Sequence, residues 1–248
     1  MTLLRVERIK LFSTRAPWWC SAIAVASSLG FAALFVGLAG DQINLTVSTS
    51  QTGTAFGRVV ILVLAVIAAA SEYNWGTIRT TFQAVPKRAP ALLAKAVVVG
   101  GWCALLGLLI GFVSWAMAVA IRPEADLALD SAADWRAVAG QAAVYLMTAA
   151  AGVGLGLLLR STALALGVAL VWTQLVEGLV VLIPGVGDDI YQWMPFFAAD
   201  QFIGAEFTRS ALGLGDMPMG PVAYGGYFAA ICLALLAAGV AAATKKDA

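Results

Sequence analysis

Six long apolar stretches, separated by polar segments, constrain this chain more than any other feature. Each is close to or above the roughly 20 residues that an α-helix needs to cross a bilayer. The first is too long for a signal-peptide core and lacks a convincing cleavage site, so we expect it to be retained. The sequence predicts one all-α, polytopic membrane domain over residues 1–248, with spans at about 17–40, 53–71, 91–121, 137–159, 162–183 and 222–243.

The composition agrees with a membrane protein. Apolar residues make up 61% of the chain and charged residues 12%, and the mean hydropathy is +0.90, which exceeds the usual range of soluble domains. There is no histidine, and Cys20, Cys103 and Cys232 each stand alone in an apolar run. This pattern argues against a metal site, a haem site or a disulfide framework. We expect no metal or cofactor in this chain and no binding to nucleic acid.

The basic residues predict the orientation. If both termini face the cytoplasm, eleven of the 15 Lys and Arg residues fall on the inner side, as the positive-inside rule requires. The outer side keeps Arg58, Arg122, Arg136 and Arg209. Arg58 lies near one end of the second span, where its side chain can reach the lipid headgroups. We therefore expect a cell-membrane protein with both termini in the cytoplasm.

A polar and basic segment at residues 71–90 joins the second and third spans. Ile78 and Phe82 lie four residues apart, a spacing that favours a short amphipathic helix on the membrane surface. Gly76 can end the preceding span, and Thr77 can cap the new helix. The alternative is an ordinary basic inner loop that contacts anionic lipid.

The residues of this segment closely resemble the inner-loop signature of type 2 ABC exporter (ABC-2) permeases, through Glu72-Tyr73, Gly76-Thr77-Ile78-Arg79-Thr80-Thr81 and Val85-Pro86 with Arg88. In that family this loop carries the coupling helix. The six-span layout is also similar, and residues 1–16 are similar to the family's interfacial elbow. The resemblance implies an ATPase-coupling site made of Glu72, Tyr73, Gly76, Thr77, Ile78, Arg79, Thr80, Thr81 and Phe82.

The resemblance further implies a half-transporter. Two copies, or this chain and a related permease, would pair in the membrane and bind two cytosolic ABC ATPase subunits. Ile78 and Phe82 would then be buried in the ATPase groove or against lipid, and Glu72 and Arg79 would form charge pairs at the rim of the contact.

ATP hydrolysis is expected in the partner, with ATP and Mg²⁺ bound there, and the chain itself is not expected to be an enzyme. It contains no Gly-x-x-x-x-Gly-Lys-Ser/Thr loop that could hold phosphates. Its one dense glycine run, residues 152–156, lies within an apolar span. That position favours close packing of helices over nucleotide binding.

Residues 184–221 form an acidic outer segment that several Pro and Gly residues interrupt. It is moderately apolar but too short to span, which suits short re-entrant helices of the kind that the resembling family often has here. An outer loop folded on the headgroups is the alternative. Asp200 is unfavourable deep in lipid, so we expect it to face water or a partner.

Gln174 and Glu177 lie well inside the fifth span, one helical turn apart. A carboxyl group there is costly if it is ionised and exposed to lipid. Glu177 can face a cavity and contact a cationic substrate or change its protonation state. It can instead fasten two helices together through hydrogen bonds.

The resulting hypothesis is the transmembrane subunit of an exporter for an amphiphilic small molecule, lipid or peptide. Two other functions stay open. One is a secondary transporter or channel, for which several intramembrane charges and interrupted helices are typical. The other is a membrane subunit of a signalling or immunity complex that transports nothing.

Overall fold

The computed structural model describes residues 2–38, 45–78, 83, 88–205 and 217–246. Every regular element within these ranges is helical. Six helical stretches are long and apolar enough to cross a membrane, so the chain is a multi-pass membrane protein. The spans are α2 (Ala16–Leu38), α4 (Thr54–Asn74), α6 (Arg88–Ile121), α7 (Ala132–Leu159), the stretch Thr162–Val180 and α13 (Pro221–Lys246).

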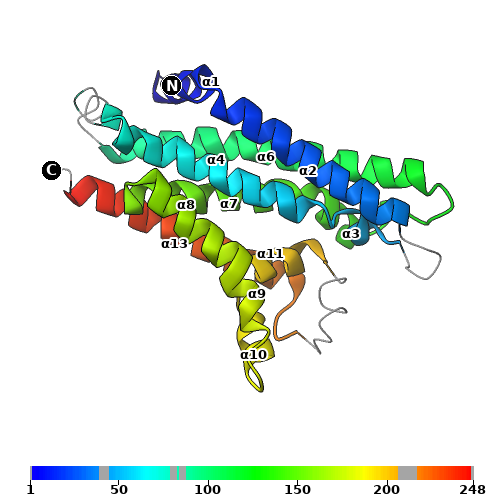
Figure 1. Ribbon diagram of the computed structural model, residues 1–248. Helices are drawn as coiled ribbons and strands as arrows, with labels where there is room; N and C mark the ends of the chain where they lie inside the picture. Colours follow the sequence, from blue (N-terminus) through cyan, green and yellow to red (C-terminus); the bar gives the residue numbers. More distant parts are fainter. Residues whose placement is uncertain (1, 39–44, 79–82, 84–87, 206–216, 247–248) are drawn as a thin grey trace.

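The bounds of these six helical stretches match those of the predicted spans to within a few residues. Two further helices lie beside them: α1 (Thr2–Ser13) precedes the first span, and the short α3 (Val47–Ser50) precedes α4. The start of α1 and the last turn of α13 lie at the same end of the bundle (Figure 1). We call this the terminal end and the other the opposite end.

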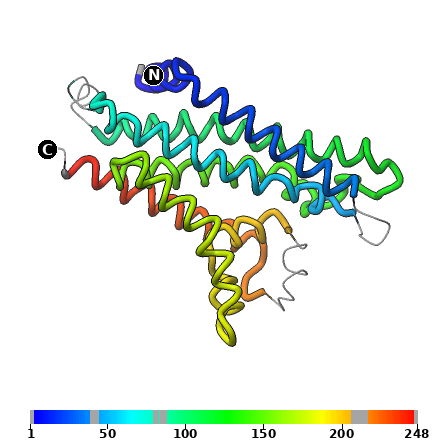
Figure 2. Tube along the Cα trace, in the orientation of Figure 1, coloured from blue at the N-terminus to red at the C-terminus, as the bar shows by residue number. Residues whose placement is uncertain are grey.

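Helix α7 lies at the centre of the bundle and packs against α4, α6 and α13, as the chain trace in Figure 2 shows. Its glycine run makes the close approach possible. A Cβ atom at Gly152 would lie 2.7 Å from the Cβ of Ala65 on α4, and one at Gly154 would lie 2.5 Å from the carbonyl oxygen of Leu235 on α13. The predicted packing role of this run is confirmed.

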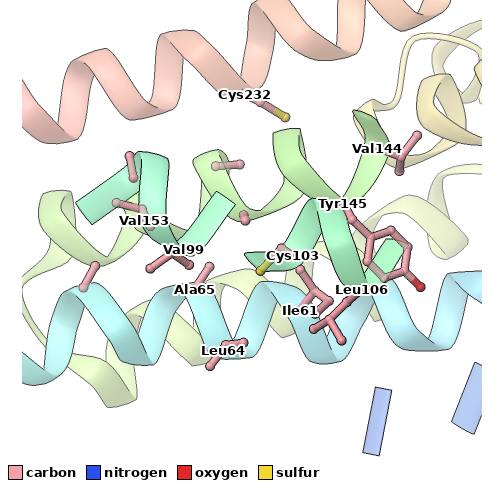
Figure 3. Close-up of a cluster of buried hydrophobic side chains, with 14 of the residues drawn as sticks. Ile61, Leu64, Ala65, Val99, Cys103, Leu106, Val144, Tyr145, Val153 and Cys232 are labelled. Atoms are coloured by element: carbon pink, nitrogen blue, oxygen red, sulfur yellow. The ribbon is translucent and has the colours of Figure 1, made fainter. Parts of the chain in front are cut away.

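The apolar core lies where α4, α6, α7 and α13 meet (Figure 3). Ile61 and Tyr145 are fully buried there. The Tyr145 hydroxyl donates a hydrogen bond to the carbonyl oxygen of Thr54 over 2.8 Å, which satisfies its polar end. Cys103 and Cys232 are buried free thiols in the same cluster.

The fifth span changes helix type along its length. It begins as α8 (Thr162–Val171), continues as the π-helix η1 (Trp172–Val176) and ends as α9 (Glu177–Val180). The apolar run did not indicate this change. Short π segments are rare and are found frequently at functional sites. The π segment ends where Glu177 begins α9.

The segment after α9 folds into two short helices, α10 (Gly187–Tyr191) and α11 (Pro195–Ile203). Helix α11 packs on α7 and α13 and buries Phe197 and Ala198. Helices α9 and α10 project away from the main bundle (Figure 1). The segment is thus partly helical and packed on the bundle, while its re-entry into the membrane remains a prediction. Residues 206–216 lie outside the described residues.

Candidate functional site

The second span ends at the segment that resembles a coupling loop. Helix α4 stops at Asn74, and Gly76 has φ +69°, in the left-handed region that favours glycine. The chain is helical again at residues 77–78. Gly76 therefore breaks the span as predicted. The remaining residues of the expected coupling site, Arg79, Thr80, Thr81 and Phe82, lie outside the described residues.

Thr77 and Ile78 turn back onto the bundle. The Thr77 hydroxyl donates to the backbone carbonyl of Glu72 over 3.4 Å, and the turn that Thr77 was expected to cap lies mostly outside the described residues. Ile78 is only 6% exposed and belongs to the same buried cluster as Leu11 of α1 and Leu92 of α6. The expected burial of Ile78 in a partner or in lipid is wrong, because the chain buries this side chain itself.

Four charged residues meet beside this turn and form what we call the four-charge cluster: Glu7, Lys10, Glu72 and Lys95. Lys95 Nζ lies 2.8 Å from Glu7 Oε2 and 2.9 Å from Glu72 Oε1. Lys10 Nζ lies 2.7 Å from Glu7 Oε1 and 3.1 Å from Glu72 Oε1. The two carboxylates and two ammonium groups compensate each other, as buried charges require. The cluster joins α1, α4 and α6.

The members of the cluster on α1, which lies outside the spans, are held in their charged forms. Burial alone raises the pKa of Glu7, but the charge of Lys95 and hydrogen bonds from both lysines outweigh it and leave the pKa below its ordinary value. Burial lowers the pKa of Lys10, yet the hydrogen bonds and charges of Glu7 and Glu72 raise it overall.

Glu72 was expected at the rim of a partner contact. Its side chain is instead only 10% exposed and is bonded to lysines of the same chain. The end of α4 is also fixed by its neighbours. The Tyr73 ring lies 5.6 Å below the Arg160 guanidinium, and Asn74 donates to the Thr162 hydroxyl over 2.9 Å. The base of the predicted coupling segment is therefore joined to α1, α6, α7 and α8.

A second charged site lies towards the opposite end. Arg58 Nη2 lies 2.8 Å from Asp200 Oδ1, and its guanidinium lies 5.3 Å above the ring of Phe196. Arg58 is 5% exposed. The expectation that it reaches the headgroups is therefore wrong, since it turns inward to α11. Asp200, expected to face water or a partner, has its charge paired within the chain.

Glu177 fastens α9 to its surroundings. Its Oε1 accepts hydrogen bonds from the Trp172 indole over 3.1 Å and from the backbone N–H of Phe196 over 3.2 Å. Phe196 lies in the first turn of α11, where N–H groups lack partners within the helix. These bonds match the fastening alternative for Glu177. Gln174 is exposed, and it lines a cavity of about 300 Å³ together with Glu177 and Arg58.

The sequence interpretation missed the four-charge cluster as a unit. Lys95 gave a signal, because it is a lone charge near the start of an apolar run, and such a charge needs a partner. Glu7 gave a second signal, because it is the one acidic residue among the basic residues before the first span.

Comparisons of the chain with protein-family models, with curated proteins and with solved structures find no match. The fold therefore defines the class, a six-span helical membrane protein, and the functional interpretation depends on the residues described above.

Proposed function

We propose that the chain is the transmembrane subunit of an ATP-driven ABC exporter, which moves an amphiphilic small molecule, lipid or peptide out of the cell. The main support is the segment that resembles a coupling loop. It begins at the glycine break directly after α4, at the terminal end, and Ile78 of its first turn is buried in the same cluster as residues of α1 and α6. A surface that a partner moves must be joined firmly to the spans, and the burial of Ile78 within the chain supports such a joint.

In this proposal both termini lie in the cytoplasm and the chain resides in the cell membrane. Two cytosolic ATPase subunits bind ATP and Mg²⁺, and a second copy of the chain or a related permease completes the transporter. Closure of the ATPases displaces the coupling segment. The buried Ile78 and the bonds of Glu72 pass that displacement to α1, α4 and α6.

The test is purification of the tagged chain from its native membrane in mild detergent, with identification and assay of any ATPase that accompanies it. Ile78→Asp is a poor probe, because it places a charge in the core. Trp75→Ala is better, since Trp75 is 82% exposed directly before Gly76. Its matched control is Trp135→Ala, which removes a 51% exposed indole from the first turns of α7.

We expect a stoichiometric ATPase with the unmodified chain and with Trp135→Ala, and a reduced amount with Trp75→Ala. A pure homo-oligomer without ATPase would refute the exporter proposal.

One observation favours a secondary transporter as the second candidate. Arg58 and Glu177 are buried in two different spans, and the second of these contains a π segment. Interrupted helices with intramembrane charges are typical of that class. Solute uptake or efflux by the reconstituted chain alone, driven by an ion gradient, would favour this function. An ATPase that binds without any transport would favour a signalling or immunity subunit.

A further inference from the structure

A groove of about 630 Å³ lies between α1 and α6, and we call it the α1–α6 groove. Its floor is apolar and includes Phe12 of α1 and Val97, Gly101 and Leu105 of α6. Val97 and Leu105 are each 60% exposed, so the groove is open to the surroundings of the bundle. Two arginines of α1, Arg5 and Arg8, line the same groove.

The groove lies where α6 loses its charges. The 34 residues of α6 extend over about 51 Å, well beyond the roughly 30 Å of a hydrocarbon core. Lys95 is the last charged residue before an uncharged stretch at 96–121. Glu7, which stands between the two arginines in the sequence, lies 2.8 Å from Lys95 Nζ. Arg5 and Arg8 are therefore held beside the start of the uncharged stretch, and the floor continues to Leu105, about 15 Å further along α6.

The two arginines of the groove are exposed, and neither has an ion-pair or hydrogen-bond partner among the described residues. Glu7 does not neutralise them, because its two oxygens are bonded to Lys10 and Lys95. Side chains three residues apart are neighbours on a helix, and like charges at that spacing repel each other. An anion between the two guanidinium groups removes this repulsion, and the planar guanidinium group matches the geometry of a phosphate.

We propose that the α1–α6 groove binds an anionic phospholipid, whose phosphate lies between Arg5 and Arg8 and whose acyl chain lies along α6 from Val97 to Leu105. The positive charges stand at the start of the uncharged stretch and the apolar floor follows it, which is the order of headgroup and chain in a lipid. This order favours a lipid over an acidic peptide or a soluble anion. The site requires no ATPase, so the proposal goes beyond the exporter function and is tested without it.

The first test compares two lipids on the unmodified chain. Native mass spectrometry of the full chain in mild detergent gives the dissociation constant of the first bound lipid, with dioleoyl phosphatidylglycerol and dioleoyl phosphatidylcholine as probes. The acyl chains are identical, and only the first lipid has a net negative charge. We expect phosphatidylglycerol to bind about tenfold more tightly, because each arginine near the headgroup adds to the attraction. Equal affinities would overturn the proposal.

The second test removes the two charges. The double variant Arg5→Gln with Arg8→Gln should fold normally, since both side chains are exposed, and should lose the preference for phosphatidylglycerol. The matched control is Arg15→Gln with Lys245→Gln, which removes two exposed charges that do not line the groove. The control should keep the preference. An equal loss in both double variants would show that only the overall charge attracts the lipid, and would overturn the proposal.

The third test fills the floor of the groove and leaves its arginines in place. A Cβ atom at Gly101 would meet nothing within 4 Å, so Gly101→Leu places its side chain in the groove without a clash. We expect the affinity for phosphatidylglycerol to fall about tenfold. The control is Gly226→Leu, at an exposed glycine of α13 that is equally free of contacts, and it should bind as the unmodified chain does. An unchanged affinity in Gly101→Leu would overturn the proposal.

A competition experiment separates a lipid from a soluble anion. The competitor is glycerophosphoglycerol, which is the headgroup of phosphatidylglycerol without its acyl chains. We expect no displacement of the lipid at equal concentrations, because the competitor has no chain to lie on the apolar floor. Displacement at equal concentrations would show that the arginines bind the phosphate alone, and would overturn the assignment of a lipid.

Discussion

The four-charge cluster and the Arg58–Asp200 pair hold the two ends of the bundle in different ways. At the terminal end, each lysine contacts both glutamates, so every charge has two partners. Towards the opposite end, Arg58 has one carboxylate partner, and its Nε is buried without a hydrogen bond among the described residues. The first arrangement is a network of four ion pairs, whereas the second is a single ion pair.

The difference matters for motion. A network that joins α1, α4 and α6 favours movement of these three helices as one body. A single pair between α4 and α11 can separate when one ion pair is exchanged for water. If the chain alternates between two states, we expect the terminal end to move as a unit and α11 to move relative to α4.

The largest expected effect on stability comes from a substitution at Lys95. Lys95→Met leaves two buried carboxylates with Lys10 alone, and breaking a buried ion network in this way costs about 3–5 kcal/mol. For a chain of this size, that corresponds to a fall in Tm of roughly 10 °C, measured by thermal unfolding in detergent. Lys245→Met, at an exposed position of α13, is the control and should be neutral. An unchanged Tm in Lys95→Met would mean that the network contributes little.

Several of these features could be predicted from the sequence. The six spans follow from apolar length alone, and the break at Gly76 follows from the preference of glycine for positive φ. The packing role of the run at 152–156 also follows, because small residues inside a span have few other uses.

The partners of the buried charges could not be predicted. Arg58 and Asp200 are far apart in the chain, and an apolar run shows only that a charge needs a partner, not which one it finds. The partners of Glu177 were harder still to predict, because one of its donors is the backbone N–H of Phe196. Every non-proline residue has such a group, so sequence carries no signal for it. The same holds for Ile78, whose spacing indicated burial but not the surface that buries it.

The second prediction concerns the single pair. Asp200→Asn removes the charge that faces Arg58, and because Asp200 is partly exposed we expect a loss of about 2 kcal/mol in the free energy of unfolding. The double variant Arg58→Met with Asp200→Asn should recover part of this loss, since no buried charge is left without a partner. Unfolding in detergent is measured for Asp200→Asn, for Arg58→Met and for the double variant, and the losses of the two single variants are compared with that of the double variant. If the two losses simply add, the two side chains are not coupled.

The third prediction concerns the backbone at the base of the coupling segment. A Cβ atom at Gly76 would meet nothing within 4 Å, so Gly76→Ala acts through its positive φ alone and should cost about 1 kcal/mol. Gly101→Ala, within α6 and equally free of contacts, is the matched control and should be neutral or slightly stabilising. Thermal unfolding of both variants gives the comparison, and equal Tm values would show that the left-handed turn is not maintained.

The smallest expected effect is the pH dependence of the contact between α1 and the spans. The folded-state pKa of Glu7 lies below its ordinary value of 4.5, so its ionised form contributes stability that is present above that value. This contribution is lost as the pH falls through the folded-state pKa. Wild type and Glu7→Gln should therefore differ in Tm near neutral pH and converge in acid. When both chains also carry Asp200→Asn, their Tm values should still converge in acid, because the Arg58–Asp200 pair does not include Glu7. A difference that stays constant down to acid pH would show that Glu7 acts by packing, and that charge does not hold α1 to α6.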